Sequence, residues 1–345
     1  MPLPCSCTFA LAASLLIAAG ELRAVLPDTG QTARHTRTFG EDSDFAGAGP
    51  RLRDNGDGTV SDEVTGLMWQ RVDGGEMTWD AALAYARGLR LAGRDDWRLP
   101  TSHELFGILN HGRNRPPLDT KFFARSAAEY WWSATTRAGD TSRVWVANAG
   151  GGTGPHPVRE TLSAGGAKRI HALCVRGAPP SAGPRLRSDG AGTVTDDATG
   201  LVWQREAPAE TMTWEEALDY CMRLNLAGHG DWRLPNIKEL RSLCDDSAAQ
   251  PLPSSLFPRV RGGSAWTSTS ENNRLDRAWH VSLDTGLVTH ALKTEQLLVR
   301  AVRGGGVMAG PREKPPVDQE SFRRSSGNGK DGAGKRRREE PAGAR

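Results

Sequence analysis

The stretch "DNGDGTVSDEVTGLMWQR", Asp54 to Arg71, recurs almost unchanged as "SDGAGTVTDDATGLVWQR", Ser188 to Arg205. The similarity continues, since "MTWDAALAYARGLRLAGRDDWRLPTSHEL" (77–105) returns as "MTWEEALDYCMRLNLAGHGDWRLPNIKEL" (212–240). Further on, "WWSATT" (131–136) returns as "AWTSTS" (265–270). Two long copies of one pattern predict tandem domains rather than a solenoid, which stacks many short repeats.

The repeat divides the 345-residue chain into segments. We predict a signal peptide at 1–24, a leader segment at 25–50, domains at 51–177 and 185–304 joined by a linker at 178–184, and a disordered basic tail at 305–345. The apolar run Phe9–Gly20 has the length of a signal-peptide core and is too short to span a bilayer. We therefore expect export to the periplasm or cell surface, with no transmembrane segment.

Each copy reads as a hairpin, two helices, long loops and final strands, which is the order of a C-type-lectin-like fold. Thr78 and Thr213 are placed as N-caps of the first helix, and Thr101 and Asn236 as N-caps of the second. The 11 tryptophans allow a loop-rich domain to build its core from large rings. The predicted fold class is α+β, with two tandem C-type-lectin-like domains of short antiparallel strands, two helices and long loops.

Ten residues of the repeated motifs are predicted to be structural, as core rings, as buried ion pairs or hydrogen bonds, or as helix entries and caps. They are Trp69, Trp97, Arg98, Pro100 and Glu104 in the first copy, and Trp203, Trp232, Arg233, Pro235 and Glu239 in the second.

The Asp/Gly-rich opening of each copy is predicted to form turns rather than a metal site. An EF-hand loop needs glycine at its sixth position, where a loop starting at Asp54 has Thr59. The second copy also has Ala191 in place of Asp57. Other calcium geometries are left open. We expect no cofactor and find no catalytic motif, and His103 is predicted to be a helix-surface residue rather than a base.

The combination of "DNGDGTVSDEVTGLMWQ", "TWDAALAYA", "DWRLPTSHEL", "YWWSATT" and "CVRG" resembles the Lcl C-terminal domain family, named after the C-terminal domain of a collagen-like adhesin. The resemblance covers both copies. That adhesin domain is associated with sulfated glycans, so the resemblance implies a binding role.

The family pattern has one cysteine in the first helix and one in the last strand. The first copy has only the strand Cys174 and the second only the helix Cys221, so neither can form that bridge. Cys221 with Cys244, or Cys221 with Cys174, are the pairings that remain.

Basic residues gather in the long loops of both copies, the half that usually meets ligands in lectin-like folds. We take eight of them as ligand-binding candidates: Arg113, Arg115, Arg137, Arg143, Arg259, Arg261, Arg274 and Arg277. Guanidinium groups pair well with planar anions, so sulfated or acidic glycans are the expected partners. The modest net charge of +3 gives no reason to expect nucleic acid.

Three functions follow from these features. The first is a non-catalytic exported binding module, adhesin-like, for glycans or other anionic surface polymers. The second is a structural or assembly protein of the cell envelope that uses the domains for protein contacts. The third is an enzyme with an unrecognised site. The sequence does not distinguish a ligand or an oligomeric state.

Overall fold

The computed structural model describes residues 26–45, 51–115, 117–159, 170–178, 184–258 and 263–304. The predicted signal peptide, most of the linker and the basic tail lie outside the described residues. Among the residues described, no helix has the length and apolar character needed to cross a membrane.

The described residues of copy one, residues 51–177, form two helices and eight strands. In chain order they are β1 (Leu52–Asp54), β2 (Thr59–Asp62), β3 (Met68–Gln70), α1 (Trp79–Gly88), α2 (Ser102–Gly107), β4 (Tyr130–Arg137), β5 (Asp140–Asn148), β6 (Thr153–Pro157), β7 (Ile170–His171) and β8 (Val175–Arg176).

Copy two, residues 185–304, repeats this order with one strand fewer among the described residues. Its elements are β9 (Leu186–Ser188), β10 (Thr193–Asp196), β11 (Leu201–Gln204), α3 (Trp214–Arg223), α4 (Ile237–Ser242), β12 (Ser264–Ser270), β13 (Arg277–Ser282), β14 (Val288–Leu292) and β15 (Val302–Gly304). Strands predominate over four short helices, and the predicted α+β class is confirmed.

The duplicated opening forms a small antiparallel sheet in each copy, with strand orders β1-β2-β3-β8 and β15-β11-β10-β9. Side chains of the Asp/Gly stretch close the first turn: Asp54 accepts the backbone N–H of Gly56 at 2.9 Å, and Gly56 has φ of +77°. Trp69 and Trp203 occupy equivalent strand positions, opposite Val60 and Val194. The opening thus positions a core tryptophan in each copy.

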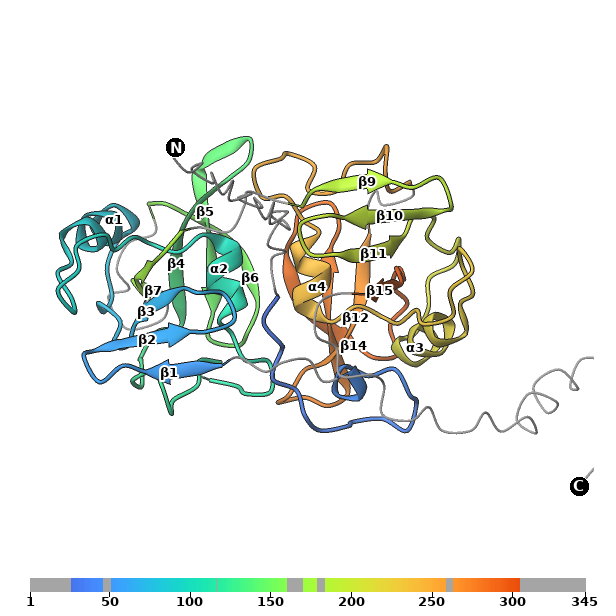
Figure 1. Ribbon diagram of the computed structural model, residues 1–345, viewed down its shortest axis with the longest axis horizontal. Coiled ribbons are helices and arrows are strands. Elements are labelled where there is room, and N and C mark those ends of the chain that lie inside the picture. The colour runs from blue at the N-terminus through green and yellow to red at the C-terminus, as the bar shows by residue number, and fades with distance from the viewer. Residues whose placement is uncertain are drawn as a thin grey trace, which may run out of the picture.

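The long strands of both copies form one seven-stranded sheet, in the order β12-β13-β14-β6-β5-β4-β7. The junction is the antiparallel pair β14–β6, where Val288 lies opposite Thr153. A Cβ on Gly152 would meet the carbonyl oxygen of Val288 at 2.8 Å, so the close approach requires glycine there. Figure 1 shows the two copies side by side, continuous through this sheet.

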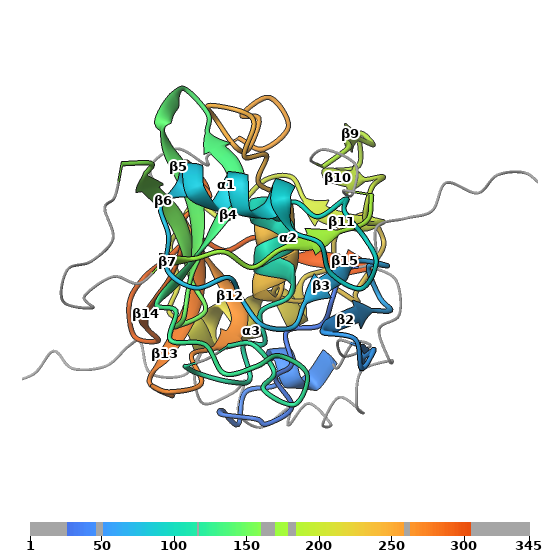
Figure 2. The same cartoon turned by 90° about the vertical axis from the view of Figure 1, so that its left-hand side faces the viewer.

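Helices α2 and α4 pack against each other across the copy boundary, between the seven-stranded sheet and the small sheets (Figure 2). The buried Lys238 of α4 donates to the carbonyl oxygens of Asp28 and Gly107, at 2.7 and 2.8 Å. On the other side, one guanidinium nitrogen of Arg241 donates to both carboxylate oxygens of Asp246, at 2.7 and 2.6 Å. One hydrophobic cluster also spans both copies, so the copies share a core.

The leader segment packs onto copy two, where it forms a short 3₁₀ helix, η1 (Asp42–Phe45), beside β12. Its polar side chains bind the end of β12: Asp42 accepts the hydroxyl of Thr269 at 2.7 Å, and Glu41 accepts that of Ser270 at 2.8 Å. The Gln31 amide bonds both the N–H and the carbonyl of Ser270. The leader is therefore part of the folded body, drawn in blue below copy two in Figure 1.

Candidate functional site

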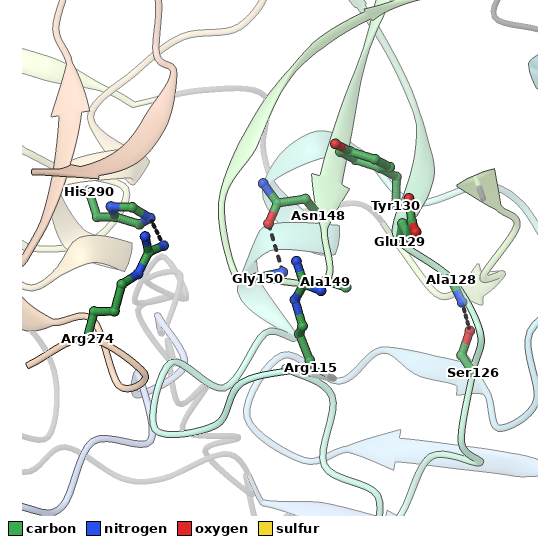
Figure 3. A pocket seen from close by; sticks show the side chains of 10 residues that line it. All are labelled: Arg115, Ser126, Ala128, Glu129, Tyr130, Asn148, Ala149, Gly150, Arg274 and His290. Atoms are coloured by element: carbon green, nitrogen blue, oxygen red, sulfur yellow. Dashed lines mark hydrogen bonds between the residues drawn. The ribbon is translucent and has the colours of Figure 1, made fainter. Parts of the chain in front are cut away.

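A pocket of about 450 Å³ lies where the two copies meet (Figure 3). Copy one supplies most of its wall and copy two supplies a loop residue and a strand residue. The lining residues are Arg115, Ser126, Ala128, Glu129, Tyr130, Asn148, Ala149, Gly150, Arg274 and His290.

Copy one supplies the floor of the pocket from the ends of two paired strands. Tyr130 begins β4 and Asn148 ends β5, and the two residues are partners in the sheet register. The Asn148 side-chain oxygen accepts the N–H groups of Gly150 and Gly152, at 2.9 and 3.1 Å, which fixes the turn after β5. The Tyr130 ring packs on His156 with centroids 4.7 Å apart. These contacts make the floor rigid and partly aromatic.

Arg115 enters from the loop that follows α2. Its backbone N–H donates to the carbonyl of Ala149 at 3.3 Å, and its φ is +43°. Arg115 therefore adopts a left-handed backbone conformation, which costs energy for any residue other than glycine. The structure gives its guanidinium no ion-pair partner among the described residues, so this charge is available to a ligand.

Arg274 comes from the β12–β13 loop of copy two. Its guanidinium donates to Nε2 of His290 at 2.8 Å, and its Nε lies 3.3 Å from the carboxylate of Glu271. Because Nε2 accepts, the His290 proton is on Nδ1. Burial, and then the charge of Arg274, hold the pKa of His290 below its ordinary value. His290 is therefore a neutral support for Arg274 rather than a second charge.

Glu271 ties the two sides of the pocket together. Its side chain is buried and accepts from the side-chain amide of Asn114 in copy one at 3.1 Å, while also pairing with Arg274. Asn114 directly precedes Arg115. One carboxylate thus positions both arginine-bearing loops.

The remaining candidate arginines lie elsewhere. Arg113 is committed to Asp119 at 2.6 Å. Arg137 stands at the far end of β4 from Tyr130, about 23 Å away at roughly 3.3 Å per residue, and Arg143 makes a 3.6 Å pair with Asp140 on the same hairpin. Arg277 begins β13 and is partly buried. Arg259 and Arg261 lie outside the described residues.

Sequence reasoning missed five polar lining residues: Ser126, Glu129, Tyr130, Asn148 and His290. Tyr130 and Asn148 belong to the repeated motifs "YWWSATT" and "RVWVAN", but only their pairing in the sheet brings them to one end. No sequence motif predicts that His290 lies beside Arg274 of the β12–β13 loop, at the boundary between the copies.

The repeated motif residues take equivalent places in the two copies. Trp97 and Trp232 are buried, and each ring N–H donates to a backbone carbonyl, of Leu91 and Leu226 respectively. Arg233 makes a bidentate ion pair with Glu239, at 2.6 and 2.7 Å.

Copy one repeats that ion pair as Arg98 with Glu104, both bonds at 2.7 Å. Each glutamate also closes the capping box of its helix. The carbonyls of Pro100 and Pro235 accept strand N–H groups of Ala134 and Ser268. These contacts are architectural and lie away from the pocket.

The predicted disulfide pairings are wrong for this structure. Cys174, Cys221 and Cys244 are all free and buried. They belong to three different hydrophobic clusters, so the packing separates them. Burial raises the pKa of Cys174 and Cys244 to about 12, which leaves these thiols protonated.

His103 is only partly at the predicted helix surface, since 31% of its side chain is exposed. It lies at the copy boundary, where its Nε2 is 3.1 Å from the Arg241 guanidinium and its Nδ1 is 3.5 Å from Asp246. Burial lowers the pKa of His103 to about 4. It is a neutral member of the buried α2–α4 contact. Across the described ranges, no group of three or more His, Cys, Asp or Glu side chains could hold a metal ion.

The fold and pocket define a duplicated α+β protein with a polar pocket between its copies. The model of the Lcl C-terminal domain matches residues 58–172 and again 192–303. The chain therefore belongs to the Lcl C-terminal domain family, in tandem. A comparison with curated proteins finds no match.

Proposed function

We propose that this protein is an exported, non-catalytic binding module that recognises anionic groups of glycans in the pocket between its copies. The observation that carries the proposal is the convergence of Arg115 and Arg274, from different copies, on one pocket. Glu271 already pairs with Arg274, so the guanidinium of Arg115, which has no ion-pair partner among the described residues, is the charge that supports anion binding.

The chemistry of the lining suits an acidic sugar. A guanidinium offers paired N–H donors to a sulfate or carboxylate. The partly exposed Tyr130 ring offers an apolar face for a pyranose. The pocket volume of about 450 Å³ falls within the range of small-ligand sites, roughly 300–1,000 Å³.

The pocket offers little for catalysis. The Nε2 of His290, its potential base, is occupied by Arg274, and the Ser126 hydroxyl accepts the N–H of Ala128 at 2.9 Å. Neither is arranged as a nucleophile and base. These contacts support binding without turnover.

Two finer assignments belong to this proposal. A C-type-lectin-like fold is supported by the order of hairpin, two helices, long loops and closing strand in each copy. Export is supported by the apolar stretch Phe9–Gly20 in the sequence. Mass spectrometry of the N-terminus in the native host tests export, and an intact Met1 on a cytoplasmic protein would overturn it.

A glycan array on the mature chain tests the binding function. We expect retention of sulfated or uronic-acid glycans and no retention of their neutral counterparts. Variants at Arg115 and Arg274 should lose this selectivity while keeping the fold. Equal binding of neutral and acidic glycans would contradict the proposal.

A further inference from the structure

The duplication provides an internal comparison for the surface that the leader covers. On copy two, Gly40 of the leader approaches Leu218 of α3; a Cβ there would lie 3.6 Å from the Leu218 side chain. Asp42 accepts the hydroxyl of Thr269, and Phe45 lies under the guanidinium of Arg233, 5.7 Å from ring centroid to Cζ. The leader thus bridges the first helix, the edge strand and the WRLP motif of copy two.

Copy one has the same surface from equivalent residues. Leu83 corresponds to Leu218, Arg98 to Arg233, Thr135 to Thr269 and Thr136 to Ser270. The local geometry is also repeated, because the Thr135 hydroxyl accepts the N–H of Ser102 at 3.0 Å as the Thr269 hydroxyl accepts that of Ile237.

The two surfaces differ in what covers them. Leu218, Thr269 and Ser270 are fully buried, whereas Leu83, Thr135 and Thr136 are only partly buried. The Arg98 side chain is 29% exposed against 5% for Arg233. Among the residues that the structure describes, no segment contacts copy one as the leader contacts copy two.

The end of β4 adds an unfilled backbone position, because the neighbouring strand β7 pairs only with Tyr130 and Trp131 at its start. On copy two the Gln31 amide bonds the N–H and carbonyl of Ser270. No described side chain makes those bonds at Thr136, the equivalent residue. An open strand edge is a template for an added extended segment.

The charged residues around this surface of copy one indicate what kind of peptide segment could bind there. Next to Thr136 stands the exposed Arg137, where copy two has Glu271. Arg98 is already paired with Glu104, and Asp140 lies opposite Arg137 in the sheet. The difference in charge between the two surfaces is therefore that copy one has the exposed Arg137 where copy two has a carboxylate. The leader carries Asp28, Glu41, Asp42 and Asp44 against Arg34 and Arg37, which makes it acidic overall.

We propose that the surface of copy one formed by Leu83, Arg98, Thr135, Thr136 and Arg137 docks an extended acidic segment of a partner protein. The segment has the chemistry of the leader: an amide for the strand edge, a carboxylate for the threonine hydroxyl, and an aromatic ring for the arginine face. This site is separate from the sugar pocket and does not depend on the proposed glycan function.

A synthetic peptide of residues 26–45 is the probe, labelled with a fluorophore and titrated into the full chain. We expect one bound peptide per chain. Leu83→Glu, which places a charge in the contact with the leader backbone, should weaken binding by more than about tenfold. Arg137→Ser should weaken it several-fold, and Leu275→Glu, an exposed site on copy two, should leave it unchanged.

A scrambled peptide of the same composition controls for charge alone. Binding that persists in Leu83→Glu would place the peptide on copy two, by exchange with the resident leader, and would overturn the proposal. So would equal binding of the scrambled peptide, or no binding to the wild-type chain. Thermal unfolding checks that the Leu83→Glu variant folds. Peptide binding to Arg137→Ser, a substitution at an exposed position, is the second test of the same surface.

Discussion

Val288 of copy two lies opposite Thr153 of copy one in a single antiparallel sheet. The tandem copies are therefore joined by backbone pairing, in addition to the linker predicted at 178–184. This pairing brings the end of β5 near the β12–β13 loop, and so creates the pocket between copies.

Gly152→Val tests the junction. The added Cβ would lie 2.8 Å from the carbonyl oxygen of Val288 and 2.9 Å from the Asn148 side chain, so the strands must separate. We expect a loss of about 1–3 kcal/mol in the free energy of unfolding, measured with urea. Gly88→Ala, at the end of α1 with no atom within 4 Å of the new Cβ, is the control. Equal stability of the two variants would refute the junction.

Asp246→Ala tests the ion pair beside α2. Both Asp246 and Arg241 are buried, so removal of the carboxylate leaves the Arg241 charge unpaired in the core. The expected cost is about 3–5 kcal/mol of unfolding free energy. The double variant with Arg241→Met removes the stranded charge and should recover much of that stability. A double variant no more stable than Asp246→Ala would count against this account.

Trp232→Ala should remove a fully buried ring and its hydrogen bond to the Leu226 carbonyl. We expect a loss of about 3–5 kcal/mol, as for other buried aromatic truncations, and a similar loss for Trp97→Ala. Calorimetry measures both. Because the copies share a sheet and a core, we expect one cooperative transition; two separate transitions would show that the copies unfold independently.

Asp42 gives the leader a pH-dependent contact. Burial raises the pKa of Asp42 to about 7, with the Thr269 hydrogen bond opposing the shift. The folded state therefore holds this proton more tightly than the unfolded chain, whose aspartates titrate near 3.9. The stability that the protonated carboxyl contributes is present below about pH 4 and is lost as pH rises to about 7.

Asp42→Asn should remove that pH dependence. The difference in unfolding free energy between variant and wild type should change by about 3 kcal/mol between pH 4 and 7, favouring the variant at the higher pH. The comparison is needed because the buried His111, with its pKa lowered to about 3, changes stability in the opposite direction over this range. Parallel stability curves for the two proteins would show that Asp42 does not titrate there.

Local chemistry explains how far the sequence predicted this fold. The helix entries at Thr101 and Asn236 followed from the three-residue spacing to a glutamate, because a capping box needs only neighbours in the chain. The sequence left Cys221 free to pair with Cys244 or with Cys174, because spacing along the chain gives no position in space. The fold buries all three in different clusters.

The candidate site was predictable only in part. Arg115 and Arg274 followed from the basic composition of the long loops. Their convergence depends on how one copy rotates against the other, and the β14–β6 pairing that sets this rotation has no distinct sequence motif. The role of the leader was not predictable for the same reason. Its polar residues bond partners more than 200 positions away in the chain, as Gln31 does with Ser270.

Heparin retention of a chain truncated after Gly304 tests the pocket most directly, because this form lacks the basic residues Lys335–Arg338. We expect retention at low salt and release as salt rises, since exposed charges are screened beyond about 8 Å at physiological ionic strength. Arg115→Ser with Arg274→Ser should abolish retention, while Arg137→Ser with Arg143→Ser, which removes the same charge at the far end of the β4–β5 hairpin, should preserve most of it. No retention of the unmutated form, or an equal loss in both double variants, would contradict an anion site between the copies.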